Sequence, residues 1–146
     1  MDVLRIRFYP DDEWIGELEV FASAGGFSGV GKAWFSKTDL KNFSQAIMAF
    51  PLPVEAPPTI SGGLGGNEKS PPQELVALTF EPHNKVGAVR ATVHLETANW
   101  DGREHGLHSE TTIRLIVTYG DLGRFGPSIL DLIEGRIAEA VLASTP

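Results

Sequence analysis

The feature that most constrains the fold is a set of short segments that occurs twice in the same order. The chain begins with the alternating stretch VLRIRF at 3–8, which is typical of a half-buried strand. FYPDDEWIGEL at 8–18 resembles FEPHNKVGAV at 80–89, and SKTDLKNFSQAIMAF at 36–50 resembles TYGDLGRFGPSILDL at 118–132. Two such resemblances in one order predict a duplicated unit of three strands and one helix.

The helix of each unit is indicated by a change of period. In the first copy, Leu40, Phe43 and Ile47 recur at helical spacing, and Ser36 with Asp39 forms a helix start signal. The second copy has the same start signal and the same apolar spacing, from Thr118 to Ile129. There, Gly126-Pro127 predicts a break or kink, after which the helical pattern continues to about residue 143.

These segments predict one domain over residues 1–146. Its internal repeat covers 3–50 and 75–133, and a Pro/Gly-rich connector at 51–72 has room for one short strand near Thr59 and Ile60. The expected fold class is α+β. We expect the duplicated βββα unit to form one twisted antiparallel sheet of six or seven strands, with the helices packed on one face.

Composition and charge narrow the class of protein. With 42% hydrophobic residues, no long apolar run and no signal peptide, the sequence predicts a soluble cytoplasmic protein that does not enter a membrane. The formal charge of −7 argues against nucleic acid as a partner. It suits a basic protein partner, although it is also explained by solubility alone.

The stretch from Gly26 to Lys32 reads G-x-x-x-x-G-K, as in a phosphate-binding loop. Such a loop must lead directly into a helix, but here Ala33-Trp34-Phe35 continues a strand. Ala33 also replaces the magnesium-binding Ser or Thr. We therefore interpret Gly25-Gly26 as a hairpin turn. Gly29 and Gly31 are then expected on the side facing the helices, where they let a helix or a bulky neighbour approach closely. No cofactor is expected.

The alternation of the strands defines a candidate interaction face, turned away from the helices. It combines charged side chains with large aromatic ones, which is typical of protein interfaces but also of solvated sheet faces. Its predicted residues are Arg5, Arg7, Glu17, Glu19, Phe21, Lys32, Trp34, Arg90, His94 and Arg114.

The segment WDGREHGLHSE at 100–110 is the second candidate site. Asp101, His105 and His108 could ligate a metal in a tightly turned loop. An ordinary polar loop is the simpler interpretation. The same loop could border a pocket for a small ligand or a substrate.

The W-F-S-x-x-D-L-x-x-F segment at 34–43 and the V-T-x-G-D-L-x-x-F segment at 117–125 resemble a group of small bacterial domains. These domains of largely unknown function are grouped with WapI-type immunity proteins of contact-dependent toxin systems. The resemblance spans most of the chain and rests on fold-determining positions. It implies a protein without catalytic activity that binds and neutralises a partner.

The sequence therefore favours a non-enzymatic protein-interaction module, of the immunity type if the resemblance holds. Its Ser28 is not part of a G-x-S-x-G motif, and the chain contains neither cysteine nor an H-E-x-x-H motif. The alternative is a small-ligand-binding protein or an enzyme with a pocket near residues 100–110.

Overall fold

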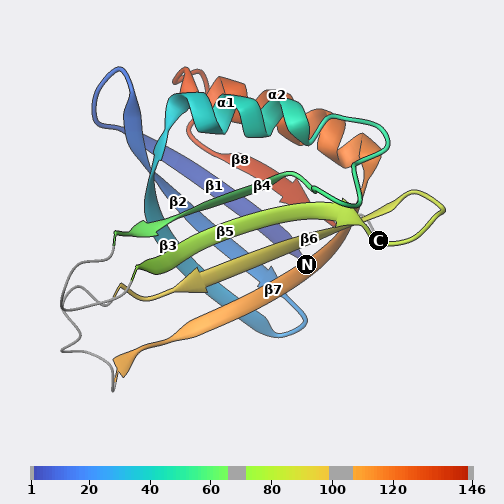
Figure 1. Cartoon of the computed structure of the whole chain (residues 1–146), viewed down its shortest axis with the longest axis horizontal. Helices are drawn as coiled ribbons and strands as arrows, with labels where there is room; N and C mark the ends of the chain where they lie inside the picture. Colours follow the sequence, from blue (N-terminus) through green and yellow to red (C-terminus); the bar gives the residue numbers. More distant parts are fainter. Residues whose placement is uncertain (1, 66–71, 99–106, 145–146) are drawn as a thin grey trace.

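The computed structural model describes residues 2–65, 72–98 and 107–144. Both halves of the chain have the same order of elements, three strands followed by one helix and one more strand (Figure 1). The first half contains β1 (Val3–Pro10), β2 (Ile15–Ala24), β3 (Phe27–Ser36), α1 (Lys37–Ala46) and β4 (Thr59–Leu64). The second half contains β5 (Gln73–Pro82), β6 (Ala88–Glu96), β7 (Glu110–Thr118), α2 (Tyr119–Ile133) and β8 (Ala140–Ala143).

The strands form two antiparallel sheets of four strands each. Sheet 1 has the order β3-β2-β1-β8, and sheet 2 has the order β4-β5-β6-β7. The predicted α+β class is confirmed, but the prediction of one sheet of six or seven strands is wrong. The last strand of each half pairs with the first strand of the other half, β4 with β5 and β8 with β1. Each sheet is therefore completed by a strand from the other half of the chain.

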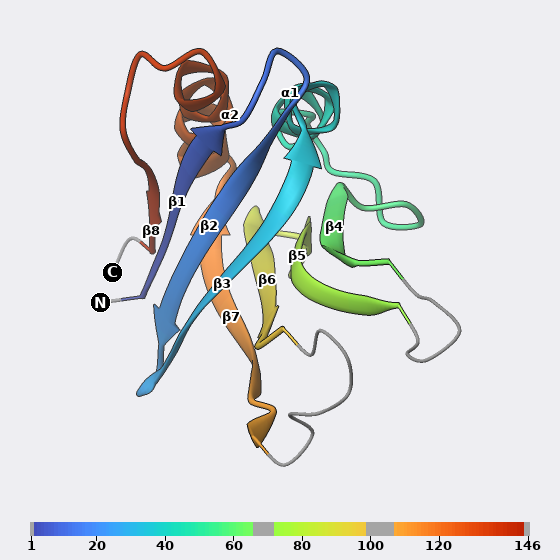
Figure 2. The same ribbon diagram turned by 90° about the vertical axis from the view of Figure 1, so that its left-hand side faces the viewer.

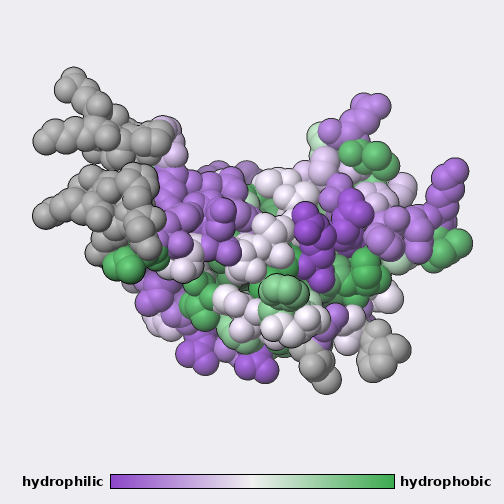
Figure 3. Space-filling view, turned by 90° about the horizontal axis from the view of Figure 1, so that it is seen from below, coloured by the Kyte–Doolittle hydropathy of each residue, from purple (hydrophilic) through white to green (hydrophobic). Residues whose placement is uncertain are grey.

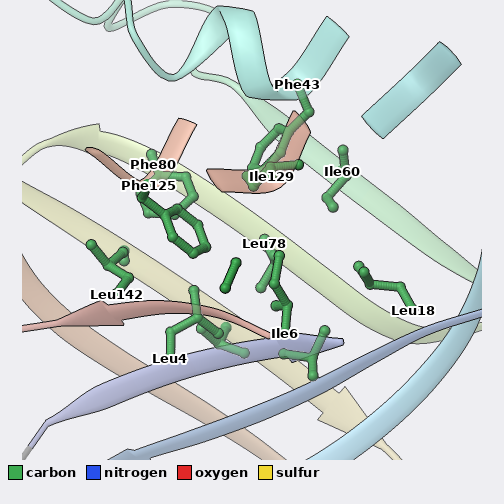
Figure 4. Close-up of a cluster of buried hydrophobic side chains, with 14 of the residues drawn as sticks. Leu4, Ile6, Leu18, Phe43, Ile60, Leu78, Phe80, Phe125, Ile129 and Leu142 are labelled. Carbon is green, nitrogen blue, oxygen red and sulfur yellow. The ribbon is translucent and has the colours of Figure 1, made fainter. Parts of the chain in front are cut away.

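The hydrophobic core lies between the inner faces of the two sheets and under the helices. The two sheets form layers that cross at an angle, and α1 and α2 lie side by side over one end of them (Figure 2). Side chains from both layers and both helices meet in this core (Figure 4). At its centre, the Phe80 ring lies 5.8 Å from that of Phe43 and 6.3 Å from that of Phe125. Two helices cannot cover both sheets, so each sheet buries its inner face against the other.

The second helix differs from the sequence prediction at two places. It continues through Gly126 and Pro127 without ending, so the predicted break is wrong. It ends at Ile133, and the predicted helical continuation to about residue 143 is also wrong. Gly135 has a φ of +76°, a left-handed conformation that suits glycine after a helix end. The chain then extends into β8, where Leu142 pairs with Leu4 and Ala140 pairs with Ile6.

Gly126 lies where the two helices come closest. A Cβ atom on Gly126 would lie 2.5 Å from Met48 Cγ and 2.9 Å from the Ser44 carbonyl oxygen. A glycine is therefore required at this crossing, which explains why a helix former is absent there. No helix in the described ranges is both long enough and apolar enough to cross a bilayer.

The glycine-rich stretch forms a turn and part of a strand. Gly25 and Gly26 both have positive φ, as a two-residue hairpin turn requires, and Ala24 pairs with Phe27. Gly29 and Gly31 face sheet 2 instead of a helix. A Cβ atom on Gly29 would lie 2.8 Å from Thr111 Cγ2, and one on Gly31 would lie 3.0 Å from Leu95 Cδ2. These glycines let the two sheets approach closely.

Candidate functional site

The predicted interaction face is divided between two surfaces. We call the side of each sheet that is turned away from the core its outer face. Arg5, Arg7, Glu17, Glu19, Phe21, Lys32 and Trp34 lie on the outer face of sheet 1. Arg90, His94 and Arg114 lie on the outer face of sheet 2. The alternation of each strand was predicted correctly, but the assumption of a single sheet joined residues that belong to different layers.

The outer face of sheet 1 has two rows of large side chains that run across the strands. Phe21 pairs with Arg5 on one side and with Val30 on the other, and Arg5 also pairs with Val141. The Arg5 guanidinium lies 5.8 Å from the centre of the Phe21 ring, a distance at which a cation–π contact is favourable.

The second row is formed by Tyr9, Glu17 and Trp34, which are consecutive partners in the sheet register. Trp34 is 51% exposed and Tyr9 is 47% exposed. Large aromatic side chains are common among the residues that anchor protein interfaces.

A charged row separates these two rows. Arg7, Glu19 and Lys32 are consecutive partners, and Lys32 Nζ lies 3.6 Å from a Glu19 carboxylate oxygen. Arg7 Nε donates a hydrogen bond of 2.9 Å to Glu139, which precedes β8. The position of Arg7, Glu19 and Lys32 on this face was predicted from the alternation of the strands. The role of Glu139 was not, because residues 134–143 were expected to continue a helix.

A shallow hollow of about 310 Å³ lies on the same face. It is lined by Arg5, Arg7, Glu19, Phe21, Val30 and Glu139. Its lining therefore combines two apolar side chains with charged groups of both signs. Seen from the side away from the helices, hydrophobic and hydrophilic residues alternate over the molecular surface (Figure 3).

The outer face of sheet 2 has smaller side chains in its centre. One row consists of Thr59, Thr79, Thr92 and Arg114, and the Thr59 and Thr79 hydroxyl groups are 3.1 Å apart. Arg90 forms an ion pair of 2.9 Å with Glu81. This face has no large aromatic side chain among the described residues of its strands, so it offers less area for a protein partner.

A cluster of two histidines and two glutamates lies at one end of this second face. We call His94, Glu96, His108 and Glu110 the His/Glu cluster. Glu96 and Glu110 are direct partners across β6 and β7. The Nε2 atom of His94 lies 2.6 Å from Glu96 Oε2 and 4.0 Å from Glu110 Oε2. The Nε2 atom of His108 lies 3.4 Å from Glu96 Oε1 and 3.8 Å from Glu110 Oε2.

The side chains of the cluster differ from the metal ligands that the sequence predicted. Asp101 and His105 lie outside the described residues, whereas His108 is described and belongs to the cluster. His94 was assigned to the interaction face, and Glu96 was missed as a ligand candidate. The register of the β6–β7 hairpin would have found the two glutamates, since it places them opposite each other.

Glu96 is held as a carboxylate by its surroundings. Burial alone would raise its pKa, but hydrogen bonds from His94 and Gln73 outweigh this effect and lower the pKa below its ordinary value. Gln73 Nε2 donates to Glu96 Oε1 at 3.3 Å. On the other side, His94 Nδ1 lies 2.9 Å from Thr112 Oγ1, which fixes the orientation of the imidazole ring.

Two further hollows could hold a small molecule. One of about 240 Å³ lies between β3 and the ends of β6 and β7, next to residues 109–111. The other, of about 440 Å³, lies beside α1 and β4, where Asp39, Asn42, Thr59 and Ser61 provide polar groups. The smaller hollow lies beside the described end of the segment at 100–110, near which the sequence suggested a pocket.

Comparisons with protein families, curated proteins and solved structures find no match to this chain.

Proposed function

We propose that this chain is a non-enzymatic protein-interaction module that binds a protein partner through the outer face of sheet 1. The observation that carries the proposal is the exposure of Trp34 in a rigid strand, with the Tyr9 ring in the same row and the Arg5–Phe21 pair nearby. Aromatic and arginine side chains supply most of the energy in protein interfaces, and a strand holds them in place at low entropic cost.

The charge of the chain indicates the kind of partner. The net charge of −7 attracts a basic protein over long range and accelerates its association. On the face itself, Arg7, Glu19 and Lys32 provide both signs of charge, so they would fix the orientation of the partner. The resemblance to WapI-type immunity domains adds a specific form of the proposal, in which the partner is a toxin that this chain neutralises.

The proposal is tested by capturing partners from the native host with matched variants. Trp34→Ala removes the exposed indole from sheet 1. Ile116→Ala is the control, because Ile116 has the corresponding place in β7 and is 41% exposed on sheet 2. We expect Trp34→Ala to weaken the affinity for a captured partner by more than about tenfold, as loss of an interface anchor does. Ile116→Ala should bind as the wild type does.

Urea unfolding of both variants separates binding from stability. Because both side chains are exposed, each substitution should change the free energy of unfolding by about 0.5 kcal/mol or less. Equal loss of binding in the two variants would contradict the proposal. Unfolding of the Trp34→Ala variant would mean that Trp34 stabilises the fold instead.

The alternative function is the binding of a small ligand. The hollow of about 440 Å³ beside α1 supports it, because its volume lies within the usual range for ligand sites and Asp39 and Asn42 line it. A ligand screen by thermal shift tests this alternative, with Asn42→Leu as the variant that should abolish any stabilisation by a ligand. A stabilising ligand whose effect persists in that variant would bind elsewhere.

A further inference from the structure

The His/Glu cluster brings four metal-binding side chains to one point. His94 and Glu96 come from the end of β6, Glu110 comes from the beginning of β7, and His108 precedes β7. One donor atom from each of His94, Glu96 and Glu110 lies within 4.8 Å of the other two. Both histidines direct Nε2 towards the same pair of carboxylates.

The distances are close to those of a tetrahedral metal site. Zinc bonds to nitrogen or oxygen are about 2.0 to 2.1 Å long, which separates neighbouring ligand atoms by about 3.4 Å. Three of the four pairs between histidine nitrogen and glutamate oxygen measure 3.4, 3.8 and 4.0 Å. The fourth, between His94 and Glu96, measures 2.6 Å and would need to open by about 0.8 Å. His94, Glu96 and Glu110 already have donor atoms within 4.8 Å of one another, and His108 would have to move closer to complete a site of four ligands.

The charges around the cluster also favour a cation. Glu96 and Glu110 are directly opposite each other in the sheet, a position in which two like charges are destabilising. Among the described residues, their ion-pair partners are the two histidines and no lysine or arginine. A divalent ion would neutralise both carboxylates at once.

The surroundings of the ligands provide the support that metal sites require. Thr112 Oγ1 lies 2.9 Å from His94 Nδ1, so it can hold the ring with Nε2 directed towards the two carboxylates. Gln73 donates a hydrogen bond to Glu96, and a second one of 2.8 Å to the Thr97 carbonyl oxygen. These contacts fix the ring of one ligand and the carboxylate of another.

We propose that the His/Glu cluster binds one divalent transition-metal ion, with Zn²⁺ as the ion that suits two imidazoles and two carboxylates. The ion would connect the end of β6, the beginning of β7 and His108. With four protein ligands the site would be closed, so its role would be to stabilise this end of sheet 2. The site is separate from the proposed protein-binding face on sheet 1.

The test is a titration of chelator-treated, untagged protein with Zn²⁺, followed by calorimetry and by thermal unfolding. We expect one Zn²⁺ per chain and a higher melting temperature. His94→Ala and His108→Ala should each weaken the affinity by at least about tenfold, and Thr112→Val should also weaken it by about tenfold through the His94 ring. Mg²⁺, which prefers oxygen ligands alone, should not compete.

Two further variants test whether Zn²⁺ binding depends on the cluster. His83→Ala removes an exposed histidine in the turn between β5 and β6, and it should bind Zn²⁺ as the wild type does. Glu110→Gln removes a ligand whose side chain is 58% exposed, so this variant should fold and yet bind weakly. The proposal is overturned if Zn²⁺ does not saturate a single site, or if His83→Ala weakens binding as much as the cluster variants. It is equally overturned if folded Glu110→Gln and His108→Ala bind Zn²⁺ with wild-type affinity.

Discussion

The two halves of the chain follow the same order of elements, yet they have side chains of different size where they meet. Gly29 of β3 lies against Thr111 of β7, and Gly126 of α2 lies against Ser44 of α1. When the similar segments at 36–50 and 118–132 are aligned, Ser44 corresponds to Gly126, and the same offset places Gly29 opposite Thr111. Gly29 makes room for the methyl group of Thr111, and Gly126 makes room for the Met48 side chain and the Ser44 carbonyl group.

The halves also differ where they face solvent. Trp34 on β3 has the position that Ile116 has on β7, and Phe21 on β2 is matched on β6 by the smaller Thr92. Packing does not restrict these outer positions. Similar backbones can therefore form one core and still present two different surfaces. The outer face of sheet 1 is aromatic, and that of sheet 2 is rich in threonine.

The largest expected effect concerns the central phenylalanine. Phe80 is 1% exposed and its ring lies near those of Phe43 and Phe125, whereas its counterpart Phe8 is at the edge of the core. We expect Phe80→Ala to lower the free energy of unfolding by about 3 to 5 kcal/mol. Phe8→Ala should cost less, at the lower end of this range or below it. Urea denaturation of both variants measures the difference, and a larger loss at Phe8 would contradict this view of the core.

The contact between Gly29 and Thr111 can be tested by exchanging the two residues. Gly29→Thr would place a Cβ atom 2.8 Å from Thr111 Cγ2, so we expect a loss of about 1 to 3 kcal/mol. Adding Thr111→Gly should recover part of this loss. A double-mutant cycle from urea denaturation should therefore give a coupling energy of more than about 0.5 kcal/mol. Simple additivity would show that the two sheets do not meet at this pair.

Alanine should have opposite effects on stability at two glycines of α2, one at the contact with α1 and one away from it. A methyl group at Gly126 would lie too close to Met48 and to the Ser44 carbonyl, whereas one at Gly123 has no atom within 4 Å. Gly126→Ala should therefore destabilise the chain by about 1 to 2 kcal/mol despite the better helix propensity of alanine. Gly123→Ala should stabilise it by about 0.5 to 1 kcal/mol. Thermal unfolding would reveal both shifts, and a stabilising Gly126→Ala would contradict the close crossing.

The two helix starts differ in how much their aspartates contribute. Thr118 N–H donates to Asp121 Oδ2 at 2.9 Å, and Arg124 donates to Oδ1 at 2.6 Å. Asp39 is exposed, and its backbone N–H bonds to the Ser36 hydroxyl. We expect Asp121→Asn to cost about 1 to 2 kcal/mol at neutral pH, and Asp39→Asn to cost about 0.5 kcal/mol or less.

The contribution of Asp121 should depend on pH. Burial alone would raise the pKa of Asp121, but the hydrogen bonds from Thr118 and the charge of Arg124 outweigh it and lower the pKa. The stabilisation is then complete above the unfolded pKa of about 3.9, and it is lost as the pH falls through the lower folded pKa. The stability difference between the wild type and Asp121→Asn should shrink below about pH 4. A difference that stays constant from pH 7 to pH 3 would show that the aspartate charge is unimportant.

Local features of the fold could be predicted from the sequence because neighbouring residues determine them. The alternation of Leu4, Ile6 and Phe8 gave the buried side of β1, and the Ser36 and Thr118 caps gave both helix starts. The division into two sheets could not be predicted in this way. It depends on which strand edges pair, and the short strands β4 and β8 each add to the sheet of the other half of the chain.

The candidate sites show the same difference between features set by neighbouring residues and features set by pairing between distant segments. The outward direction of Trp34 and Lys32 follows from alternation, so it was predicted. The His/Glu cluster depends on the register between β6 and β7 and on the position of His108, which are set by pairing across a long loop. The loop sequence itself drew attention to His108 together with Asp101 and His105, whereas His94 and Glu96 come from the neighbouring strand.

The measurement that tests the proposed function most directly is photo-crosslinking in the native host. A photoreactive phenylalanine analogue is placed at position 34 on sheet 1, and at position 116 on sheet 2 as the matched control. We expect one discrete protein adduct from position 34 and none of the same mass from position 116. The same adduct from both positions, or an adduct from position 116 alone, would contradict the claim that the aromatic outer face of sheet 1 binds the partner.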